Sequence, residues 1–519
     1  MSDPNQTTNG SRPVVERRSI DYIPHSERHG RAWHLWSVWF CGEAHLTTLA
    51  VGVIGISMGT NLLWTGLAII LGCAFGTLFM AGHSAQGPHM GLPQLIQSRP
   101  QFGYLGALLI YCVAIVTYIG YNAFNQVLAG QTLHSVTSAP EGPSALAFTL
   151  LALVMAFFGY QWFHKLQRWL SYVTIVGLAV LTVGIAASGI IPAEQLSLSG
   201  FALAPFLAQF FTAAAYQLSW AVYVSDYSRY LPRNVNTRST FWWTYFGAGF
   251  GGTWMMLIGA AAAAASKEAN LTQALVNAGD TVFPGFGPTV VLLALVVLVT
   301  SAAQNFYGGS LTLLSILATL KPQSVTFAKR VAALAVTGAL GIGVAAAATD
   351  DFLNQFQHLL ALLLCLFTPW TAVNLIDYYW VRRGRFSIRA VFDPNGMYGR
   401  WGWRGLVSYA LGFLAMLPFA VIGPLEGPVA RMLGGADVSM PVGLLVAGVV
   451  YLYACRGLDI DRELALIPDL DRDLDRNPDG TRPRAVSRPP EQANGPTQAP
   501  TAPDAAEGTP SDTAGHATR

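Results

Sequence analysis

The stretch VTYIGYNAFNQVLAG, residues 116–130, carries rings and amides within a run that is otherwise apolar. Five of these side chains recur at positions i, i+3, i+4, i+7 and i+8, so on a helix they share one face. A lone asparagine in such a run is as often a hydrogen bond between helices as a binding group. Five together favour a solvated cavity, because amides both donate and accept hydrogen bonds. The five residues are Tyr118, Tyr121, Asn122, Asn125 and Gln126.

Two further apolar runs contain polar groups of the same kind. AAAYQLSW, residues 213–220, and VTSAAQNFYGGS, residues 299–310, both place amides and hydroxyls in the middle of a hydrophobic segment. Polar side chains are costly in lipid, so such residues tend to face the protein interior. These runs add the candidates Tyr216, Gln217, Ser219, Trp220, Thr300, Ser301, Gln304 and Asn305.

The first apolar run, WFCGEAHLTTLAVG at residues 39–52, holds the ionisable residues Glu43 and His45. A carboxyl group within a membrane span is a functional candidate by default, since an unpaired charge there is expensive. The alternative is a neutral, hydrogen-bonded carboxyl at a helix contact. Glu43 and His45 are two residues apart and point in different directions on a helix, so the pair does not match a metal or catalytic motif.

The elements that must position these residues are membrane helices. Hydrophobic residues make up 52% of the 519 residues and charged residues only 11%, against about 25% charged in a typical soluble domain. The apolar runs are continuous and about 20 residues long, which suits helices and not the alternating strands of a membrane barrel. The sequence therefore predicts an all-α integral membrane protein. Its twelve candidate spans are centred near Leu46, Ile70, Ala114, Leu153, Val176, Ala214, Trp254, Leu295, Ala335, Leu363, Phe413 and Val446.

The distribution of lysine and arginine predicts the orientation. Twenty of these residues fall in every second gap between spans, beginning with the N-terminal tail, and the intervening gaps hold only Lys267 and Arg431. Basic residues remain on the cytoplasmic side, so we expect both termini in the cytoplasm and the protein in the plasma (inner) membrane. Residues 1–30 are polar and show no cleaved signal peptide. Residues 456–519 are poor in apolar side chains and are predicted to be disordered, apart from a short amphipathic turn near Leu464.

The first and sixth spans each begin a set of five spans and carry polar interruptions at matching points. Such a pattern indicates an inverted-repeat transporter with a binding site near the middle of the membrane. No nucleotide-binding motif such as GxxxxGKS occurs, so we expect an ion gradient and not ATP to drive transport. The five cysteines have no paired spacing and indicate neither a disulfide framework nor a zinc site. The net charge of +2 gives no indication of a nucleic-acid partner.

Four segments resemble a known family. GPHMGLPQLIQSRPQFGYLG (87–106) and VSDYSRYLP (224–232) are similar to signature segments of the nucleobase:cation symporter family 1, and NLIDYYWVRRGRF and YGRWGWRGLVSYALG resemble its tenth and eleventh spans. The resemblance extends from about residue 31 to residue 419. It implies a membrane domain at 31–455 with the five-plus-five inverted-repeat fold of amino-acid transporters. The two core repeats would cover about 34–190 and 204–382, and two peripheral helices about 403–455.

The resemblance also implies a site for a flat heterocycle between two aromatic rings. The position in the third span matches Tyr121, and the one in the sixth span matches Tyr216 or Gln217, with Trp220 one turn further on as a substitute. Groups that read the ring edge would be Tyr118 or Asn125, Ser219, and Gln304 or Asn305; Asn122 shares their helix face. A site of this kind rejects the wrong base by leaving a buried polar group unpaired.

For coupling, the resemblance implies a sodium ion near Gly42, Thr300 and Ser301. Glu43 and His45 lie where sodium-coupled relatives have uncharged residues, and they motivate the alternative of proton coupling through Glu43. No cofactor is expected besides the coupling ion, H⁺ or Na⁺, and the expected partners are a small heterocycle and the lipid bilayer.

Two other classes of function remain as alternatives. A cation-coupled transporter of amino acids or other small amines on the same fold would not need stacked aromatic rings. A membrane enzyme or channel is disfavoured, because the sequence has no metal-ligand spacing, no nucleophile elbow and no repeated filter residues. The sequence leaves open which heterocycle is carried and the oligomeric state.

Overall fold

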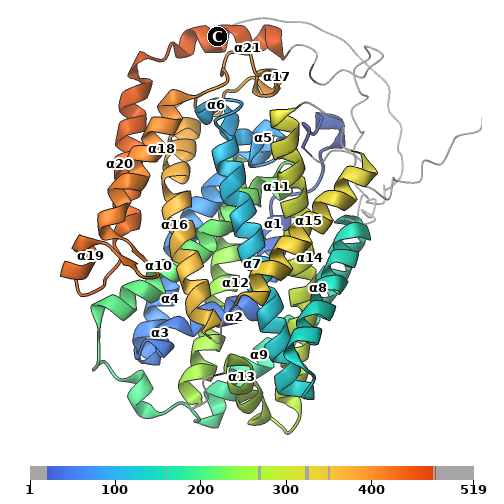
Figure 1. Ribbon diagram of the computed structural model, residues 1–519, viewed down its shortest axis with the longest axis vertical. Helices are drawn as coiled ribbons and strands as arrows, with labels where there is room; N and C mark the ends of the chain where they lie inside the picture. The colour runs from blue at the N-terminus through green and yellow to red at the C-terminus, as the bar shows by residue number, and fades with distance from the viewer. Residues whose placement is uncertain are drawn as a thin grey trace, which may run out of the picture.

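The computed structural model describes residues 20–158, 160–266, 270–321, 326–348, 351–471 and 474. In this part of the chain almost all regular structure is helical (Figure 1). The strands β1 (Val421–Ile422) and β2 (Leu425–Glu426) form a two-residue antiparallel pair in one connection. The expectation of an all-α membrane protein is therefore confirmed.

Each of the twelve expected span centres lies in a helix. Seven helices of the described chain are long and apolar enough to cross a membrane, and three shorter apolar helices lie among them. The helices that contain the centres are α2 (Leu46–Gly52), α4 (Leu62–Ser84), α7 (Leu108–Thr137), α8 (Glu141–Phe158), α9 (Tyr160–Ser188), α10 (Leu203–Ser219), α12 (Thr237–Ala265), α14 (Phe286–Leu320), α15 (Phe327–Ala346), α16 (Phe352–Ile376), α18 (Trp403–Met416) and α20 (Ser439–Ala454).

The first span is broken in its middle. Helix α1 (His34–Gly42) ends before Glu43, and α2 begins only after His45, which has an extended backbone. The amide of Glu43 still bonds back to Trp39 and Phe40, but the amide of His45 bonds only to the carbonyl of Glu43, 2.9 Å away. The regular helical hydrogen bonding therefore stops at this point, and α3 (Ile54–Ser57) completes the span after α2.

The sixth span is interrupted as well. Helix α10 ends at Ser219, the 3₁₀ turn Trp220–Tyr223 follows, and α11 (Val224–Ser228) continues the chain. A 3₁₀ turn has three residues per turn and not 3.6, so it rotates the side chains that follow it relative to an unbroken helix. The interruptions thus fall in the two spans that the sequence pattern singled out.

Small residues allow the spans of the core to pack closely. A Cβ atom on Gly76 of α4 would collide with the backbone of Ala214 in α10, and one on Gly259 of α12 with the backbone of Leu49 in α2. Close backbone approach at glycine is typical of helix packing in lipid. Large apolar side chains such as Val183, Phe250 and Leu150 are exposed on the outside of the bundle, as expected for a surface that faces hydrocarbon.

Shorter helices close the ends of the bundle. Figure 1 shows α5, α6, α17 and α21 at one end and α3 and α13 at the other. Their bounds are α5 (Gly87–Met90), α6 (Arg99–Phe102), α13 (Leu271–Asp280), α17 (Ile388–Phe392), α19 (Pro428–Met432) and α21 (Ile460–Leu470). The remaining short turns are His25–Glu27, Ile96–Ser98, Ala193–Leu196, Leu417–Phe419 and Cys455–Gly457, and Asp377–Val381 is a π-helical turn.

The sequence predicts a disordered tail from residue 456, whereas the structure has helix α21 (Ile460–Leu470) beyond that residue. Ordered structure continues to residue 471, because α21 is held against the bundle by ion pairs and backbone caps. Composition alone did not reveal these contacts with distant residues. The amphipathic turn expected near Leu464 lies in this helix, and residues 475–519 lie outside the described part of the chain.

Candidate substrate and cation site

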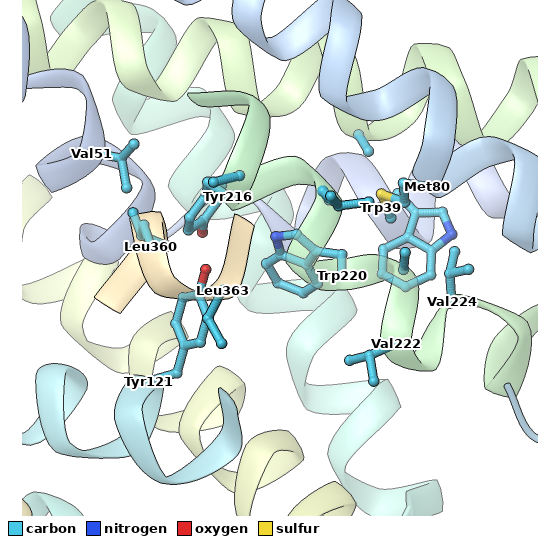
Figure 2. Packing of buried hydrophobic residues seen from close by; sticks show 14 of the residues in the cluster. Trp39, Val51, Met80, Tyr121, Tyr216, Trp220, Val222, Val224, Leu360 and Leu363 are labelled. Carbon is cyan, nitrogen blue, oxygen red and sulfur yellow. The ribbon is translucent and has the colours of Figure 1, made fainter. Parts of the chain in front are cut away.

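Aromatic rings from the third and sixth spans meet beside the break in the first span. The hydroxyl of Tyr121 lies 2.8 Å from Oγ of Ser219, and the rings of Tyr121 and Tyr216 are 6.0 Å apart in an edge-to-face arrangement. Trp220 lies 6.0 Å from the Tyr216 ring. Figure 2 shows the hydroxyl ends of Tyr121 and Tyr216 directed toward the same space next to Trp220. All four side chains are buried.

The first turn of α2 connects the same two spans. The hydroxyl of Thr47 donates to Oδ1 of Asn125 in α7 at 2.6 Å, and Thr48 lies 2.7 Å from the hydroxyl of Tyr216 in α10. We did not single out either threonine from the sequence, although they directly follow the break. Neighbouring hydroxyls of the first span thus bond to the third span and to the sixth span.

His45 and Trp220, which lie beside these contacts, have polar ring atoms without a hydrogen-bond partner. Both nitrogens of the His45 ring and Nε1 of Trp220 are buried without a partner, and the two rings lie 6.4 Å apart. A buried polar atom without a partner costs about 1–3 kcal/mol and requires an explanation. A bound molecule with donors and acceptors on its edge would satisfy these atoms.

Glu43 lies in a second group of polar residues, between α1, α10 and α12. Thr48 donates to its Oε2 at 3.4 Å, and the amide of Gln217 is within its reach. A Cβ atom on Gly252 of α12 would collide with Nε2 of Gln217, so that amide is packed directly on α12. Tyr216 and Gln217 were the two candidates for the sixth-span residue that faces Tyr121. Tyr216 makes this contact, whereas Gln217 lies beside Glu43 and α12. Oε1 of both Glu43 and Gln217 is buried without a hydrogen bond.

A cavity that is open on one side lies between α7, α11 and α14. Three candidates, Tyr118, Gln304 and Asn305, line it together with Tyr223 and Asp226. The rings of Tyr118 and Tyr223 stack 5.7 Å apart with an angle of 25° between them. We call this cavity the vestibule. Its other lining residues are Ile20, Pro93, Leu95, Ile96, Met155, Ala156, Tyr227, Arg229, Tyr230, Ala303, Tyr307, Gly308, Leu311, Thr312 and Ser315.

A continuous series of rings joins the buried cluster to the vestibule. Tyr223 lies 5.7 Å from Trp220 and the same distance from Tyr118. We did not identify Tyr223 from the sequence, because helical spacing through the sixth span fails after the 3₁₀ turn at Trp220. The rings of Tyr121, Tyr216, Trp220, Tyr223 and Tyr118 thus form one series, in which each ring contacts the next.

The polar stripe of the third span divides into two groups. Tyr121 and Asn125 bond to the sixth and first spans, and Tyr118 packs on Gly308 of α14 and stacks on Tyr223. Asn122 and Gln126 instead pack against Gly341 of α15. A Cβ atom on Gly341 would lie 3.1 Å from Nε2 of Gln126 and 3.6 Å from Cβ of Asn122. Asn122 therefore does not join the ring cluster in this structure.

The two candidate sodium ligands of the eighth span are buried in α14, which packs against α2. The hydroxyl of Thr300 donates to the carbonyl of Val297 in its own helix at 2.7 Å. No cluster of three or more His, Cys, Asp or Glu side chains suited to a metal ion occurs among the described residues. Sodium sites are built largely from carbonyl and hydroxyl oxygens, so this observation does not bear on sodium.

The signature segment at residues 224–232 has a structural role at the end of the bundle. Asp226 accepts a hydrogen bond from the amide of Gln94 at 2.8 Å, and Ser225 and Ser228 donate to the carbonyls of His83 and Ser84. These bonds attach α11 to the end of α4 and to the loop that follows.

Comparison with known proteins places this geometry in a family. Residues 22–443 match the family model described as a permease for cytosine/purines, uracil, thiamine and allantoin. YxlA of Bacillus subtilis is 36% identical over 84% of this chain and 95% of its own length. The purine-cytosine permease FcyB of Emericella nidulans is 23% identical over 84% of this chain and 88% of its own length.

Solved structures show the same fold. Mhp1, a nucleobase-cation-symport-1 family transporter, in a closed conformation with bromovinylhydantoin bound, superimposes with a TM-score of 0.69 at 17% identity, covering 88% of this chain and 100% of Mhp1. Its inward-facing conformation gives 0.67 at 18% identity, covering 90% and 98%. The chain is thus a multi-pass transporter and not an enzyme, and it belongs to the permease family for cytosine/purines, uracil, thiamine and allantoin.

Proposed function

We propose that this protein imports a nucleobase or a closely related heterocycle of the cytosine or purine type, driven by a cation gradient. The observation that carries the proposal is the buried cluster of Tyr121, Tyr216 and Trp220 beside the unpaired nitrogens of His45. Relatives named as purine-cytosine permeases support the substrate class. A small amine or amino acid would leave these ring faces without a role.

In this proposal the substrate enters the cluster by replacing contacts within the protein. The hydroxyl pairs Tyr121–Ser219 and Tyr216–Thr48 open, and the two tyrosine rings with Trp220 then contact the faces of the heterocycle. His45 offers one donor and one acceptor when its ring is neutral. Such a pair is complementary to a ring edge on which an N–H lies beside an unprotonated nitrogen or a carbonyl.

The vestibule would be the release path. Tyr118 and Tyr223 continue the series of ring faces toward it, and Gln304 and Asn305 supply amides along its wall. Arg229 lines the same vestibule, and the basic loops of the sequence favour this end as the cytoplasmic one. We therefore propose that the protein lies in the plasma (inner) membrane, that both termini are cytoplasmic and that the vestibule opens to the cytoplasm.

For the driving ion we propose a proton carried by Glu43. Its carboxyl is fully buried at the break, in contact with a hydroxyl of α2 and near an amide of α10. Protonation or deprotonation of Glu43 would change its hydrogen bonding to α2 and α10, which both contribute residues to the proposed substrate site. Sodium near Gly42, Thr300 and Ser301 is the alternative, since the Thr300 hydroxyl donates within its own helix and keeps its lone pairs for an ion.

Uptake of radiolabelled cytosine, adenine, hypoxanthine, uracil and allantoin into cells that express the protein tests the proposal, with external sodium and pH varied independently. We expect saturable accumulation of one base that depends on pH and is abolished by Tyr121→Ala. Tyr172→Ala is the matched control, because that ring is half exposed on α9. If a folded protein accumulates none of the bases, or if Tyr121→Ala transports normally, the proposed site is wrong.

A further inference from the structure

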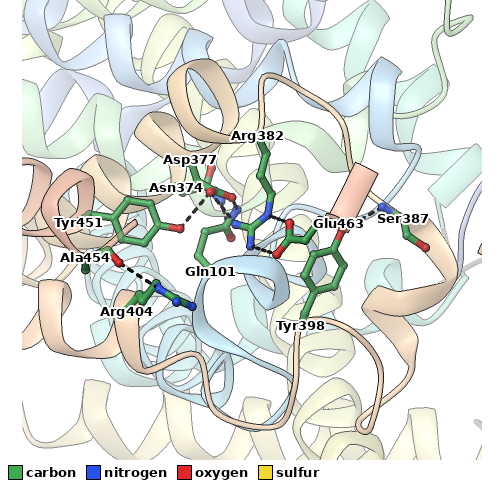
Figure 3. A network of polar contacts seen from close by, with 10 residues as sticks. All are labelled: Gln101, Asn374, Asp377, Arg382, Ser387, Tyr398, Arg404, Tyr451, Ala454 and Glu463. Carbon is green, nitrogen blue, oxygen red and sulfur yellow. Dashed lines mark hydrogen bonds and ion pairs between the residues drawn. The ribbon is translucent and has the colours of Figure 1, made fainter. Parts of the chain in front are cut away.

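Helix α21 is attached to the end of the tenth span by a charged cluster. Glu463 binds the guanidinium of Arg382 through both oxygens, with 2.9 Å from Nε to Oε2 and 3.0 Å from Nη2 to Oε1. Arg382 also donates to Oδ1 of Asp377 at 2.6 Å. Figure 3 shows the arginine held between the two carboxylates. Bidentate pairs of this kind fix geometry as well as adding energy.

Asp377 extends the cluster into two further elements. It is fully buried and accepts hydrogen bonds from Gln101 of the segment α6 at 2.7 Å and from the hydroxyl of Tyr451 in α20 at 3.0 Å. The π-helical turn that starts at Asp377 is therefore fixed by α6, α20 and, through Arg382, by α21. None of these residues belongs to the ring cluster or lines the vestibule.

A second attachment lies at the other end of α21. Both carboxylate oxygens of Asp471 accept hydrogen bonds at the start of α17: from Oγ of Ser387 at 3.0 Å and from the amides of Ile388 at 2.9 Å and Arg389 at 3.1 Å. Helix α21 thus bridges both ends of the segment 382–389, which connects the tenth span to α17. We call α21 with these two attachments the strap.

The strap is built to detach without unfolding the bundle. No residue of α21 is fully buried, although Ile460, Leu464 and Ile467 are half-buried, and the polar bonds at its two ends fix its position. If Glu463 leaves, Arg382 keeps Asp377 as its partner and no buried charge is stranded. The side chain of Glu463 is already 15% exposed, and Arg389, whose amide binds Asp471, is exposed as well. Segments with few buried apolar contacts open at low free-energy cost.

The tenth span also reaches the ring cluster. At its other end, Phe356 contacts the Tyr121 ring at 5.5 Å and stacks on Phe124 at 3.7 Å. One helix therefore carries a contact to the candidate substrate site and the anchor of the strap. A restraint on one end of this helix is a restraint on an element that packs against the site.

We propose that α21 is a releasable strap that restrains the tenth span, and that its release increases the rate of transport. The geometry supplies both parts of a regulatory contact: a polar docking site that stays charge-balanced when vacated, and a helix that leads from it to the site. The effect on rate rests on the proposed function, whereas the release of α21 can be measured without any substrate.

The test compares Glu463→Ala and a chain that ends at Gly457 with two controls: a chain that ends at Leu474, and Glu426→Ala, which removes an exposed ion pair with Arg431. Hydrogen exchange of the purified proteins reports on the strap. We expect faster exchange at residues 377–392 in the first two proteins only. Uptake should show a maximal rate raised about twofold or more with KM changed less than about twofold, because conformational steps often limit turnover.

Asp377→Asn separates this role from a structural one. It removes the buried negative charge that balances Arg382 and should lower the melting temperature strongly, whereas Glu463→Ala should melt near the wild type. Unchanged hydrogen exchange at residues 377–392 in Glu463→Ala and in the chain that ends at Gly457 would show that α21 does not restrain the tenth span. Faster exchange with an unchanged transport rate would overturn its regulatory role. If the wild type transports none of the bases, the proposed function fails, while the exchange data still decide whether α21 detaches.

Discussion

The hydroxyl of Tyr121 and Oγ of Ser219 lie 2.8 Å apart, 98 positions from each other in the chain. Ser219 is the last residue of α10, and its Oγ also donates to the carbonyl of Tyr216. The contact therefore joins the third span to the sixth at the residue where the sixth span stops being a regular helix. A ligand that separates these two residues would act directly on that junction.

Tyr121→Phe should keep transport and change the affinity only slightly. The ring face remains, and Ser219 keeps its bond to the Tyr216 carbonyl. The lost hydroxyl pair is worth about 0.5–1.5 kcal/mol and has to open when the base enters, so its removal should lower KM, by about tenfold at most. Uptake kinetics over a range of base concentrations measure this change. Loss of transport equal to that of Tyr121→Ala would show that the hydroxyl, and not the ring face, is the essential group.

His45→Leu should reduce affinity for the transported base by about tenfold or more, because a substrate polar group would be left buried without a partner at about 1–3 kcal/mol. His45→Gln retains a donor and an acceptor and should recover part of the affinity. Competition against a labelled base gives the affinities.

The matched control for His45 is Thr60→Val. The Thr60 hydroxyl is also buried without a partner, but it lies outside the ring cluster, and its removal should leave affinity unchanged. Equal affinities for His45→Leu and the wild type would show that the unpaired nitrogens of His45 do not bind the substrate.

Glu43→Gln should uncouple transport from the proton gradient. The amide keeps the size of the carboxyl and its contact with Thr48, but it cannot take up a proton. We expect a variant that exchanges labelled for unlabelled base across vesicle membranes and no longer accumulates base against a gradient. Glu426→Gln, in an exposed ion pair, is the control. Uptake that stays concentrative and pH-dependent in Glu43→Gln would rule out this role.

Gly76→Ala should destabilise the protein. A Cβ atom at this position would meet the backbone of Ala214 in α10, with 2.7 Å to its Cα, and overpacking of this kind costs about 1–3 kcal/mol. In Gly142→Ala the added atom has nothing within 4 Å, so this control should be at least as stable as the wild type. Melting temperatures in detergent measure both. Equal melting temperatures would mean that the α4–α10 contact can relax.

The sequence by itself determined the fold class and supplied most residues of the candidate site. Continuous apolar runs of about 20 residues specify membrane helices because an unpaired backbone is too costly in lipid. Polar side chains within such runs must face inward, and for that reason Tyr121, Tyr216, Ser219 and Trp220 could be chosen without a structure. These are local properties of the chain, which periodicity reports directly.

Only the tertiary structure decided which of these residues meet. Periodicity places Asn122 on the same helix face as Tyr121. In the structure, however, Asn122 packs against α15, whereas Tyr121 bonds to Ser219 of the sixth span. The choice between Tyr216 and Gln217 depends on how close α12 comes at Gly252.

Other parts of the site and of the fold depend on where regular helix stops and on distant partners. The 3₁₀ turn after Ser219 directs Tyr223 toward the vestibule, and the break at Glu43 brings Thr48 to Tyr216. Helix α21 lies in a segment too polar to order itself, and it is fixed by Arg382, 81 positions earlier in the chain. Helix breaks and long-range ion pairs arise from packing between spans, which spacing along one helix does not encode.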